Sequence, residues 1–323
     1  MWHLKKIQLV LMTFLILTLS GCSQTQDPGD KIKETLVIAD QFGLAYAPLE
    51  IMKEKHFLES ALKTAGRETV EISWLRLGNT TAMRESMLSG NLDIGFVGIP
   101  PFLLGVENGM DWKIISGLSE SAVSLISKDA RISSLKDLTS DHRIILPQPG
   151  SIQHILLQMA AKDQLGDPHA LDDQLLSMSH PDGVVAFTSG QENLLHYTTP
   201  PFIQENLKDD DAFELLDGET SFGESFTFIV GMCRADVYED TALYNAFVSA
   251  LTESINYMNT HPQASLEILA NAYEYDQESL REQITSGQIQ FTTEIKGIER
   301  FVQFMNEIGL LSEVYTTDTL IWQ

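Results

Sequence analysis

Positive charge is scarce in this sequence. Its 323 residues include 21 Lys and Arg against 45 Asp and Glu, so the formal net charge is −24 at pH 7. Nucleic-acid binding needs clustered basic side chains that contact phosphates, and the chain has no basic run. The composition therefore argues against a nucleic-acid partner. Its 43% hydrophobic content favours a folded core over disorder.

Cysteine is also rare, with two residues in the whole chain, Cys22 and Cys233. Cys233 ends the apolar run "FTFIVGMC", which is typical of a buried side chain rather than a nucleophile. Cys22 lies at the end of the N-terminal leader described below. We therefore expect no disulfide within one mature chain.

Motifs of the common catalytic chemistries are missing as well. The chain has no Gly-rich dinucleotide fingerprint, no P-loop, no HExxH and no GxSxG. We therefore expect a protein that is not an enzyme and holds no cofactor. The histidines that could bind a metal are scattered without ligand spacing, so no metal site is expected. They are His56, His142, His154, His180 and His196.

The N-terminus carries a short apolar run, 7–19, which is too short to span a bilayer. Lys5 and Lys6 precede it, and Ser20, Gly21 and Cys22 follow it. This order predicts a secretory signal peptide, residues 1–21.

The letters "LSGC" at the end of this leader resemble the bacterial lipobox. The resemblance implies lipid attachment to Cys22, and with it an extracytoplasmic protein anchored to the bacterial membrane. Residues 22–34 are mostly polar and include Pro and Gly, so we expect them to be the lipidated tether.

From residue 35 onward, expected strands alternate with expected helices. Apolar runs rich in β-branched residues predict strands, and Ser, Asn, Pro and Gly mark the helix ends. The first series has strands at 35–40, 70–77, 93–98, 112–118 and 121–128, with helices at 47–66, 79–90 and from Pro100. The second has strands at 143–148, 174–179, 193–197 and 212–217, with helices at 151–166, 181–190 and 200–207. This alternation predicts mainly parallel sheets flanked by helices.

Two stretches a hundred positions apart match each other. "LSGNLDIGFVGIPPFL" (88–103) and "TSGQENLLHYTTPPFI" (188–203) share Ser, Gly, Pro, Pro and Phe at aligned positions. The same order of elements surrounds both, which predicts two lobes of one topology. We expect the strand at 225–236 and the helical remainder to return to the first lobe. The prediction is lobe 1 at 35–128 and 225–323, and lobe 2 at 129–224, with two crossovers near 128–135 and 217–225 at the hinge.

Three segments carry a family resemblance: "DQFGLAYAPLEIMKEKHFLE" (40–59), "MLSGNLDIGFVG" (87–98) and "SSLKDLTSDHRIILPQPGS" (133–151). They resemble the solute-binding lipoproteins of ABC importers of the nitrate/sulfonate/taurine type. The resemblance implies a type II periplasmic-binding-protein fold, whose two α/β lobes close on a ligand. It implies a small-molecule ligand, the permease and ATPase of the importer as partners, and a monomer. The segment "HYTTPPF" departs from the "WxP" of many relatives, so the ligand contacts there differ.

Ligands of parallel α/β sheets gather at the carboxyl ends of strands, where helix N-termini point. Applied to the expected strands, this rule predicts the following ligand contacts: Gln41, Phe42, Gly43, Tyr46, Asn79, Thr80, Gly98, Gly150, Ser151, Gln153, Tyr197, Thr198 and Thr199. Structural roles are the alternatives: helix N-caps for Asn79 and Ser151, turn geometry for the glycines, and core packing for the tyrosines.

These candidates are polar and mostly neutral, and only Arg76 could add a charge, unless it pairs with an exposed acid. Such a set suits a sulfonate- or nitrate-type anion at helix N-termini, or a nitrogen heterocycle such as a pyrimidine between Tyr46 and Tyr197. We expect delivery of this ligand to an ABC importer by cleft closure. The alternatives are a metal-binding or structural surface lipoprotein, or an enzyme similar to thiamine-pyrimidine synthases on the same fold.

Overall fold

The structure is a computed structural model that describes residues 33–190 and 193–322. The predicted signal peptide, Cys22 and all but the last two residues of the predicted tether lie outside the described residues. One compact unit begins at Glu34. Within the described ranges, no helix combines the length and the apolar character needed to cross a membrane.

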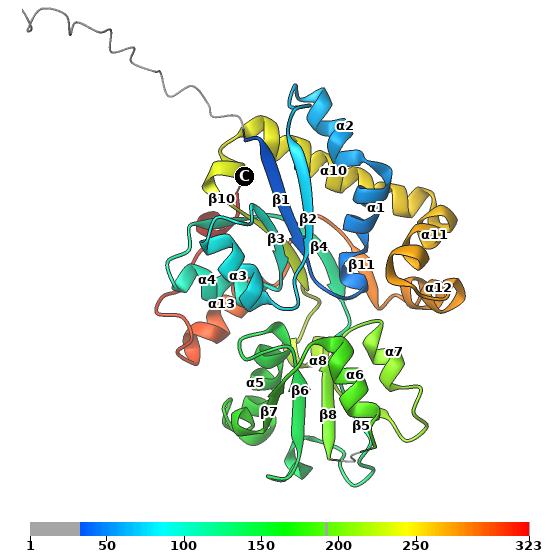
Figure 1. The fold of residues 1–323 in the computed structure, drawn as a ribbon. Helices are drawn as coiled ribbons and strands as arrows, with labels where there is room; N and C mark the ends of the chain where they lie inside the picture. Colours follow the sequence, from blue (N-terminus) through cyan, green and yellow to red (C-terminus); the bar gives the residue numbers. More distant parts are fainter. Residues whose placement is uncertain (1–32, 191–192, 323) are drawn as a thin grey trace, which may run out of the picture. The chain divides into compact units, whose positions relative to one another are not determined.

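A six-stranded sheet forms the core of what we call the first lobe (Figure 1). Its strand order is β11-β4-β10-β3-β1-β2. The strands are β1 (Thr35–Asp40), β2 (Glu71–Arg76), β3 (Ile94–Val97), β4 (Trp112–Ser121), β10 (Ile229–Arg234) and β11 (Ile289–Phe291). β1 runs parallel to β2 and β3, whereas β10 runs antiparallel to β3 and β4, and β11 antiparallel to β4.

Helices cover this sheet, with α3, α4 and α13 on one side and α1, α11 and α12 on the other (Figure 1). They are η1 (Leu44–Tyr46), α1 (Ala47–Lys55), α2 (Phe57–Thr64), α3 (Thr80–Leu88), α4 (Ile99–Glu107), α9 (Ala235–Tyr238), α10 (Thr241–Thr260), α11 (Pro262–Tyr273), α12 (Gln277–Thr285), α13 (Ile298–Glu307) and α14 (Thr317–Leu320). The single helix predicted at 47–66 is interrupted at His56, whose φ of 54° ends α1. The chain restarts at Phe57, and α2 packs against α10.

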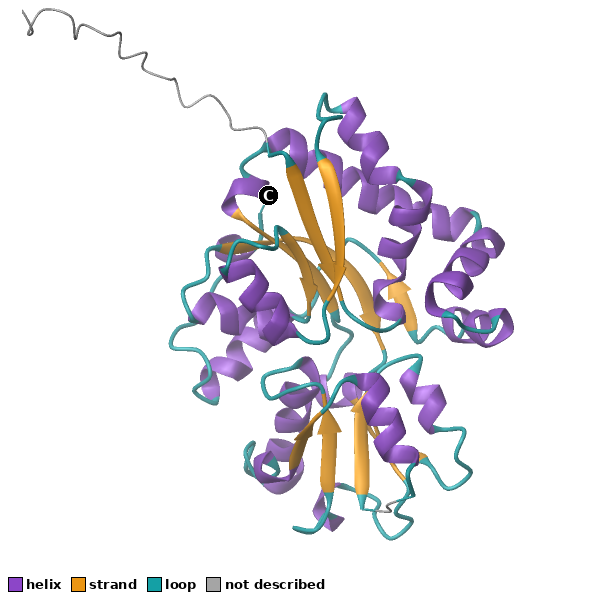
Figure 2. Ribbon diagram, viewed as in Figure 1, coloured by secondary structure: helices purple, strands orange, loops and turns teal. Residues whose placement is uncertain are grey.

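A five-stranded sheet flanked by helices forms the second lobe (Figure 2). Its strand order is β7-β6-β8-β5-β9. Its strands are β5 (Ser124–Ser127), β6 (Arg143–Leu146), β7 (Leu175–Ser177), β8 (Leu194–Thr198) and β9 (Phe213–Asp217). Its helices are η2 (Leu135–Asp137), α5 (Ile152–Leu165), η3 (Asp172–Gln174), α6 (His180–Thr188), α7 (Phe202–Asn206) and α8 (Gly218–Phe222). β6 runs parallel to β7 and β8, and β5 antiparallel to β8 and β9.

The two sheets share one topology, as the repeated stretches predicted. The order β2-β1-β3-β10-β4 in the first lobe corresponds strand by strand to β7-β6-β8-β5-β9 in the second. The repeats occupy equivalent places: Ser89 ends α3 and Ser189 ends α6, and Gly90 and Gly190 follow with φ of 76° and 95°. The positive φ explains why both repeats have glycine at this position, since other residues adopt a positive φ only at a cost in free energy.

The α/β class with two helix-covered sheets is confirmed, but both sheets are mixed rather than mainly parallel. β5 comes directly after the first-lobe strand β4 in the chain but belongs to the second-lobe sheet, where it runs antiparallel to its neighbours. β10 comes after the strands of the second lobe but belongs to the first-lobe sheet, where it is also antiparallel to its neighbours. The expected boundary at residue 128 therefore differs from the structure, in which the chain has already crossed before Ser124. The sequence of a short apolar strand does not indicate which sheet it joins. In the structure, Leu125 pairs with Tyr197 and Leu216, which places β5 in the second-lobe sheet.

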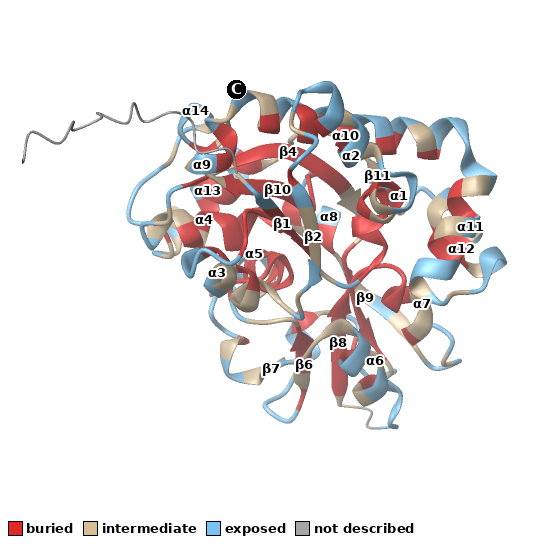
Figure 3. Ribbon diagram, turned by 45° about the horizontal axis from the view of Figure 1, so that its top comes forward, coloured by how far each residue is buried: buried red, intermediate tan, exposed pale blue. Residues whose placement is uncertain are grey.

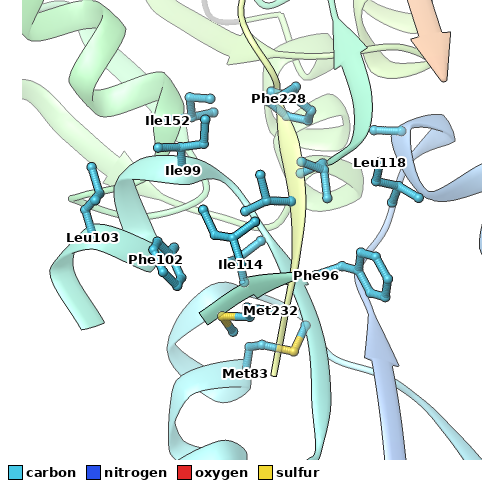
Figure 4. Packing of buried hydrophobic residues seen from close by; sticks show 14 of the residues in the cluster. Met83, Phe96, Ile99, Phe102, Leu103, Ile114, Leu118, Ile152, Phe228 and Met232 are labelled. Carbon is cyan, nitrogen blue, oxygen red and sulfur yellow. The ribbon is translucent and has the colours of Figure 1, made fainter. Parts of the chain in front are cut away.

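Buried side chains follow the strands of both sheets (Figure 3). In the first lobe, Met83 of α3 and Met232 of β10 lie together on one face of the sheet, and Phe96 of β3 points to the other face, where its ring centroid is 6.2 Å from that of Phe247 (Figure 4). Ile99 at the start of α4 lies near Ile152 at the start of α5, so the apolar packing continues from one lobe to the other (Figure 4).

Candidate ligand-binding site

A small cavity lies between the lobes, where strand ends and helix N-termini meet. Its volume is about 50 Å³, which is room for a few water molecules. It is lined by the segment after β1, the starts of α3, α4, α5 and α6, the residue after β8, and the entry to β10. The lining residues are Gln41, Phe42, Ala45, Tyr46, Gly78, Thr80, Gly98, Pro101, Pro147, Ser151, Ile152, Gln153, Ser179, His180, Thr199, Phe228 and Ile229.

Most of the predicted contacts come together at this cavity. Those that line it are Gln41, Phe42, Tyr46, Thr80, Gly98, Ser151, Gln153 and Thr199. They come from both lobes, because the rule about strand ends applies to each sheet. Their role as ligand contacts stays a prediction.

Three predicted residues do not line the cavity but stabilise the backbone next to it. Asn79 accepts a hydrogen bond from the N–H of Ala82 and so caps α3. Gly150 has a φ of 78° and donates its N–H to His154 Nδ1 at 2.9 Å. Gly43 has a φ of 120°, and its carbonyl accepts from the Tyr273 hydroxyl at 3.3 Å. These are the structural roles that were the alternatives for Asn79 and the glycines.

Tyr197 and Thr198 also lie outside the cavity lining. Tyr197 is fully buried in the core on the α5 side of the second sheet, so it does not face Tyr46 across the cleft. Side chains alternate between the faces of a strand, and Tyr197 still belongs to β8 rather than to the loop after it. Thr198, on the other face, contacts His180.

Several lining residues were not predicted: Ala45, Gly78, Pro101, Pro147, Ile152, Ser179, His180, Phe228 and Ile229. Ser179 and His180 follow β7, so the rule about strand ends finds them once it is applied to the expected strand 174–179. Phe228 and Ile229 enter from the connection between the lobes, and no local pattern marks them.

His180 is a neutral side chain that joins three elements. Its Nδ1 lies 2.9 Å from Thr198 Oγ1, and its Nε2 lies 3.4 Å from Gln153 Nε2. An amide nitrogen donates, so Nε2 accepts and Nδ1 carries the proton. The ring stacks on Phe202, with centroids 5.4 Å apart. Loss of hydration lowers the pKa of His180 to about 4, so the imidazole is uncharged near neutral pH.

Tyr46 contributes a hydrogen-bond donor that the protein itself does not use. Its side chain is 4% exposed and lines the cavity, and within the described residues its hydroxyl makes no hydrogen bond. Burial, aided by the negative charge of Asp40, raises the pKa of Tyr46, so the hydroxyl keeps its proton. The oxygen is not enclosed by the protein, so water or a ligand in the cavity can reach it.

The N-terminus of α5 adds backbone donors to the second-lobe wall. Ser151 caps this helix by accepting from the N–H of His154. The N–H groups of Ile152 and Gln153 fall in the first turn, where a helix has no internal partner for them. In the first lobe, α4 offers fewer donors, because Pro100 and Pro101 occupy its first turn.

A buried ion cluster lies directly beside the site, at the end of β1. Asp40 is fully buried and accepts from Arg76 Nε at 3.0 Å, Arg76 Nη2 at 2.9 Å and Lys53 Nζ at 2.9 Å. Glu50 pairs with the same two cations. Arg76 is therefore neutralised within the protein, and no lysine or arginine lines the cavity.

A larger crevice of about 700 Å³ lies between α5, α8 and α13. Lys162 of α5 and Glu307 of α13 form an ion pair beside it. This crevice is lined mainly by the flanks of α5 and α13, with Leu216 near the end of β9 and Arg300 in the first turn of α13. The small cavity is the better candidate for ligand binding in spite of its size, because strand ends and helix N-termini of both sheets meet there.

The comparisons with solved structures agree with this architecture. The sulfonate-binding protein SsuA of Escherichia coli matches with a TM-score of 0.69 and 20% identity, over 90% of this chain and 92% of that chain. The alkanesulfonate-binding SsuA of Xanthomonas axonopodis pv. citri, bound to MOPS, matches with a TM-score of 0.71 and 18% identity, over 90% and 98%.

The chain has the periplasmic-binding-protein fold. The nitrate-binding protein NrtA of Synechocystis PCC 6803 shares it, with a TM-score of 0.65 and 15% identity over 89% of this chain and 84% of that chain. No family model matches the chain, and no curated protein sequence matches it. Similarity at these identities establishes the periplasmic-binding-protein fold, and the expectation of that fold is confirmed.

Contacts between the lobes hold the cavity closed in this structure. The N–H and hydroxyl of Thr81 donate to Gln148 Oε1 at 3.3 and 3.1 Å. A Cβ atom on Gly150 would lie 2.6 Å from Leu104 Cδ1 of the first lobe. Closed lobes of a periplasmic-binding-protein fold thus leave no room for a side chain at Gly150.

Gly150→Val is expected to weaken ligand binding ten- to a hundredfold, because overpacking of about 1–3 kcal/mol would act on the closed form alone. The matched control is Gly166→Val at the other end of α5. Gly166 has the same φ of 78°, but a Cβ there meets nothing within 4 Å. Both variants should lose stability through backbone strain. Equal affinities of the two variants, measured by calorimetric titration with the ligand found in the screen described below, would contradict the prediction.

Proposed function

We propose that this protein is an extracytoplasmic, lipid-anchored solute-binding protein that delivers a small molecule to an ABC importer by closing its two lobes. The observation that carries the proposal is the hydroxyl of Tyr46. It is protonated and makes no hydrogen bond within the described residues, and it belongs to a largely buried side chain that lines a cavity between the lobes. An interlobe cavity with an unused donor suits a ligand that binds the closed form.

The fold supports the same function, because the similar structures named above bind sulfonates or nitrate. For this chain we propose a sulfonate- or nitrate-type anion, with a nitrogen heterocycle as the second class. The start of α5 and the Tyr46 hydroxyl provide N–H and O–H donors for an anion, and the helix dipole favours negative charge. A flat heterocycle would lie against Phe42 or Tyr46, since Tyr197 does not reach the cavity.

The partners follow from this role: the permease and ATPase of the importer, and the membrane through lipidated Cys22, with the protein itself a monomer. Mass spectrometry of the mature N-terminus tests the anchor. We expect a diacyl or triacyl modification on Cys22 and its loss in Cys22→Ser. An unmodified wild-type N-terminus that retains residues 1–21 would contradict the proposed anchor.

Metal binding is the alternative that the structure addresses most directly. Among residues 33–190 and 193–322, no group of three or more His, Cys, Asp or Glu side chains could hold a metal ion.

A melting-temperature screen tests the proposed function, with nitrate, methanesulfonate, pentanesulfonate and a pyrimidine as probes. A ligand at a hundredfold excess over its Kd should stabilise the protein by about 2.7 kcal/mol. We expect Tyr46→Phe to bind this ligand about tenfold more weakly, because one hydrogen bond to a charged or polar group is lost.

The control for this loss is Tyr315→Phe. The Tyr315 hydroxyl donates to Glu107 at 2.9 Å, and neither residue lines the cavity. This variant should bind as tightly as wild type. The proposal is wrong if none of the probes raises the melting temperature, or if Tyr46→Phe and Tyr315→Phe bind the stabilising ligand equally well.

A further inference from the structure

We propose that Arg76 is a positioning residue that fixes the ring of Phe42 as an apolar wall of the cavity, so that the site selects a ligand with an apolar group beside its polar head. This inference rests on the proposed solute-binding function and narrows it. It separates organic ligands from small inorganic anions.

Phe42 is the aromatic side chain of the cavity that still has free surface. It lines the cavity and is 42% exposed, whereas Tyr46 and Phe228 are 4% and 5% exposed. Exposed apolar surface beside a binding cavity gains free energy when an apolar group covers it. The polar donors lie elsewhere in the lining, at Tyr46 and the start of α5. A ligand that uses both parts has a polar end and an apolar end.

Arg76 holds this ring from the protein side. Its guanidinium carbon lies 5.9 Å from the ring centroid of Phe42 and 5.8 Å from that of Tyr273. Both distances suit a cation–π contact. Two hydrogen bonds to the buried Asp40 determine the plane of the guanidinium, because arginine binds a carboxylate in a fork. One side of Phe42 therefore rests on a group that cannot rotate freely.

Hydrogen bonds also hold the residues on either side of Phe42 in place. The residue before it, Gln41, donates from Nε2 to the carbonyl of Phe96 at 3.0 Å. The residue after it, Gly43, accepts from the Tyr273 hydroxyl at 3.3 Å. Positions that are held before binding lose less entropy when the ligand arrives. The ring is thus part of a prepared wall rather than a side chain that orders on binding.

Arg76 itself does not act as the ligand's counter-ion. It does not line the cavity, and Asp40 and Glu50 already pair with it. Its influence on the ligand therefore passes through Phe42. This arrangement explains how an arginine can lie beside the site while the lining remains uncharged.

The test compares two probes with the same head group, methanesulfonate and pentanesulfonate, by calorimetric titration of the full chain. Each methylene removed from water contributes about a fourfold gain in affinity. We expect pentanesulfonate to bind wild type at least ten times more tightly. In Phe42→Ala and in Arg76→Lys, we expect this ratio to fall to about threefold or less. Arg76→Lys keeps a cation for Asp40, so it should fold even though the planar contact is lost.

Arg67→Lys is the matched control for Arg76→Lys. Arg67 also pairs with one carboxylate, since its Nη2 donates to both oxygens of Asp240 at 3.0 and 2.9 Å, but it lies away from the cavity. In Arg67→Lys, the ratio of the affinities for pentanesulfonate and methanesulfonate should equal that of wild type. Tyr273→Phe provides a second variant, because it removes only the hydroxyl that holds Gly43 and should lower the ratio by a smaller factor.

Equal affinities for the two sulfonates in wild type would overturn the inference. A ratio of ten or more that persists in both Phe42→Ala and Arg76→Lys would also overturn it, and so would binding of nitrate without binding of either sulfonate. In these cases the proposed solute-binding function still stands. If none of the probes of the melting-temperature screen binds, the proposed function itself is wrong and this inference falls with it.

Discussion

Asp40→Asn is expected to lower the free energy of unfolding by about 3 kcal/mol. Removing one partner of a buried ion pair typically costs about 3–5 kcal/mol, and the lower end applies here because both cations are partly exposed. Burial alone would raise the pKa of Asp40, but the hydrogen bonds and charges of Arg76 and Lys53 outweigh it and lower the pKa. The carboxylate is therefore ionised, and a neutral amide in its place leaves Arg76 and Lys53 with Glu50 alone.

Urea unfolding of the ligand-free protein measures this loss. Asp240→Asn is the control, because both oxygens of Asp240 accept from one arginine nitrogen, Arg67 Nη2, but Asp240 keeps some exposure. Asp240 caps α10 as well, and asparagine is an equally good N-cap. This control should cost about 1 kcal/mol or less. A loss at Asp40 no greater than the loss at Asp240 would show that the cluster contributes little.

The stability of the protein is expected to fall by on the order of 3 kcal/mol between pH 7 and pH 5, largely through His180 and His196. Burial lowers the pKa of His180 to about 4, and burial together with the nearby His180 lowers the pKa of His196 to about 3. Both values lie below the ordinary 6.5, so the unfolded chain takes up protons first as the pH falls. Their stabilising contribution is complete above about pH 6.5 and is lost progressively below it.

Packing explains why His196 resists protonation. The Asn206 amide nitrogen lies 2.8 Å from its Nδ1, which must therefore accept. On the other side, a Cβ on Gly183 would lie 2.5 Å from Nε2, so α6 covers the ring closely. The hydrogen bond with Asn206 raises the pKa of His196, but the burial of the ring outweighs it.

The measurement is the free energy of unfolding at several pH values between 5 and 7.5. We expect His196→Gln to reduce the slope by about 1 kcal/mol per pH unit. The control is His56→Gln, an exposed position where the slope should not change. A wild-type profile that stays flat from pH 7 to pH 5 would contradict the assignment of these two rings as neutral in the folded protein.

The fold and the cavity were most predictable where the same local pattern occurs in both halves of the chain. The repeated Ser-Gly and Pro-Pro-Phe positions predicted two lobes with one topology, and the five shared strands confirm it. The rule about strand ends located Gln41, Tyr46 and Ser151, which now line one cavity. Tyr197, the next-to-last residue of β8, points into the core instead, because successive side chains of a strand alternate between the two faces of the sheet.

The sequence by itself determined the α/β alternation and the duplication, because periodicity, caps and strand ends are encoded over a few neighbouring residues. Only the tertiary structure decided that β5 and β10 pair in the opposite lobes, that Phe42 rather than Tyr197 faces the cavity, and that Asp40 neutralises Arg76. Each of these depends on segments far apart in the chain that meet only after folding. Which residues meet is a property of the packed sheets, and no local pattern along the chain carries it.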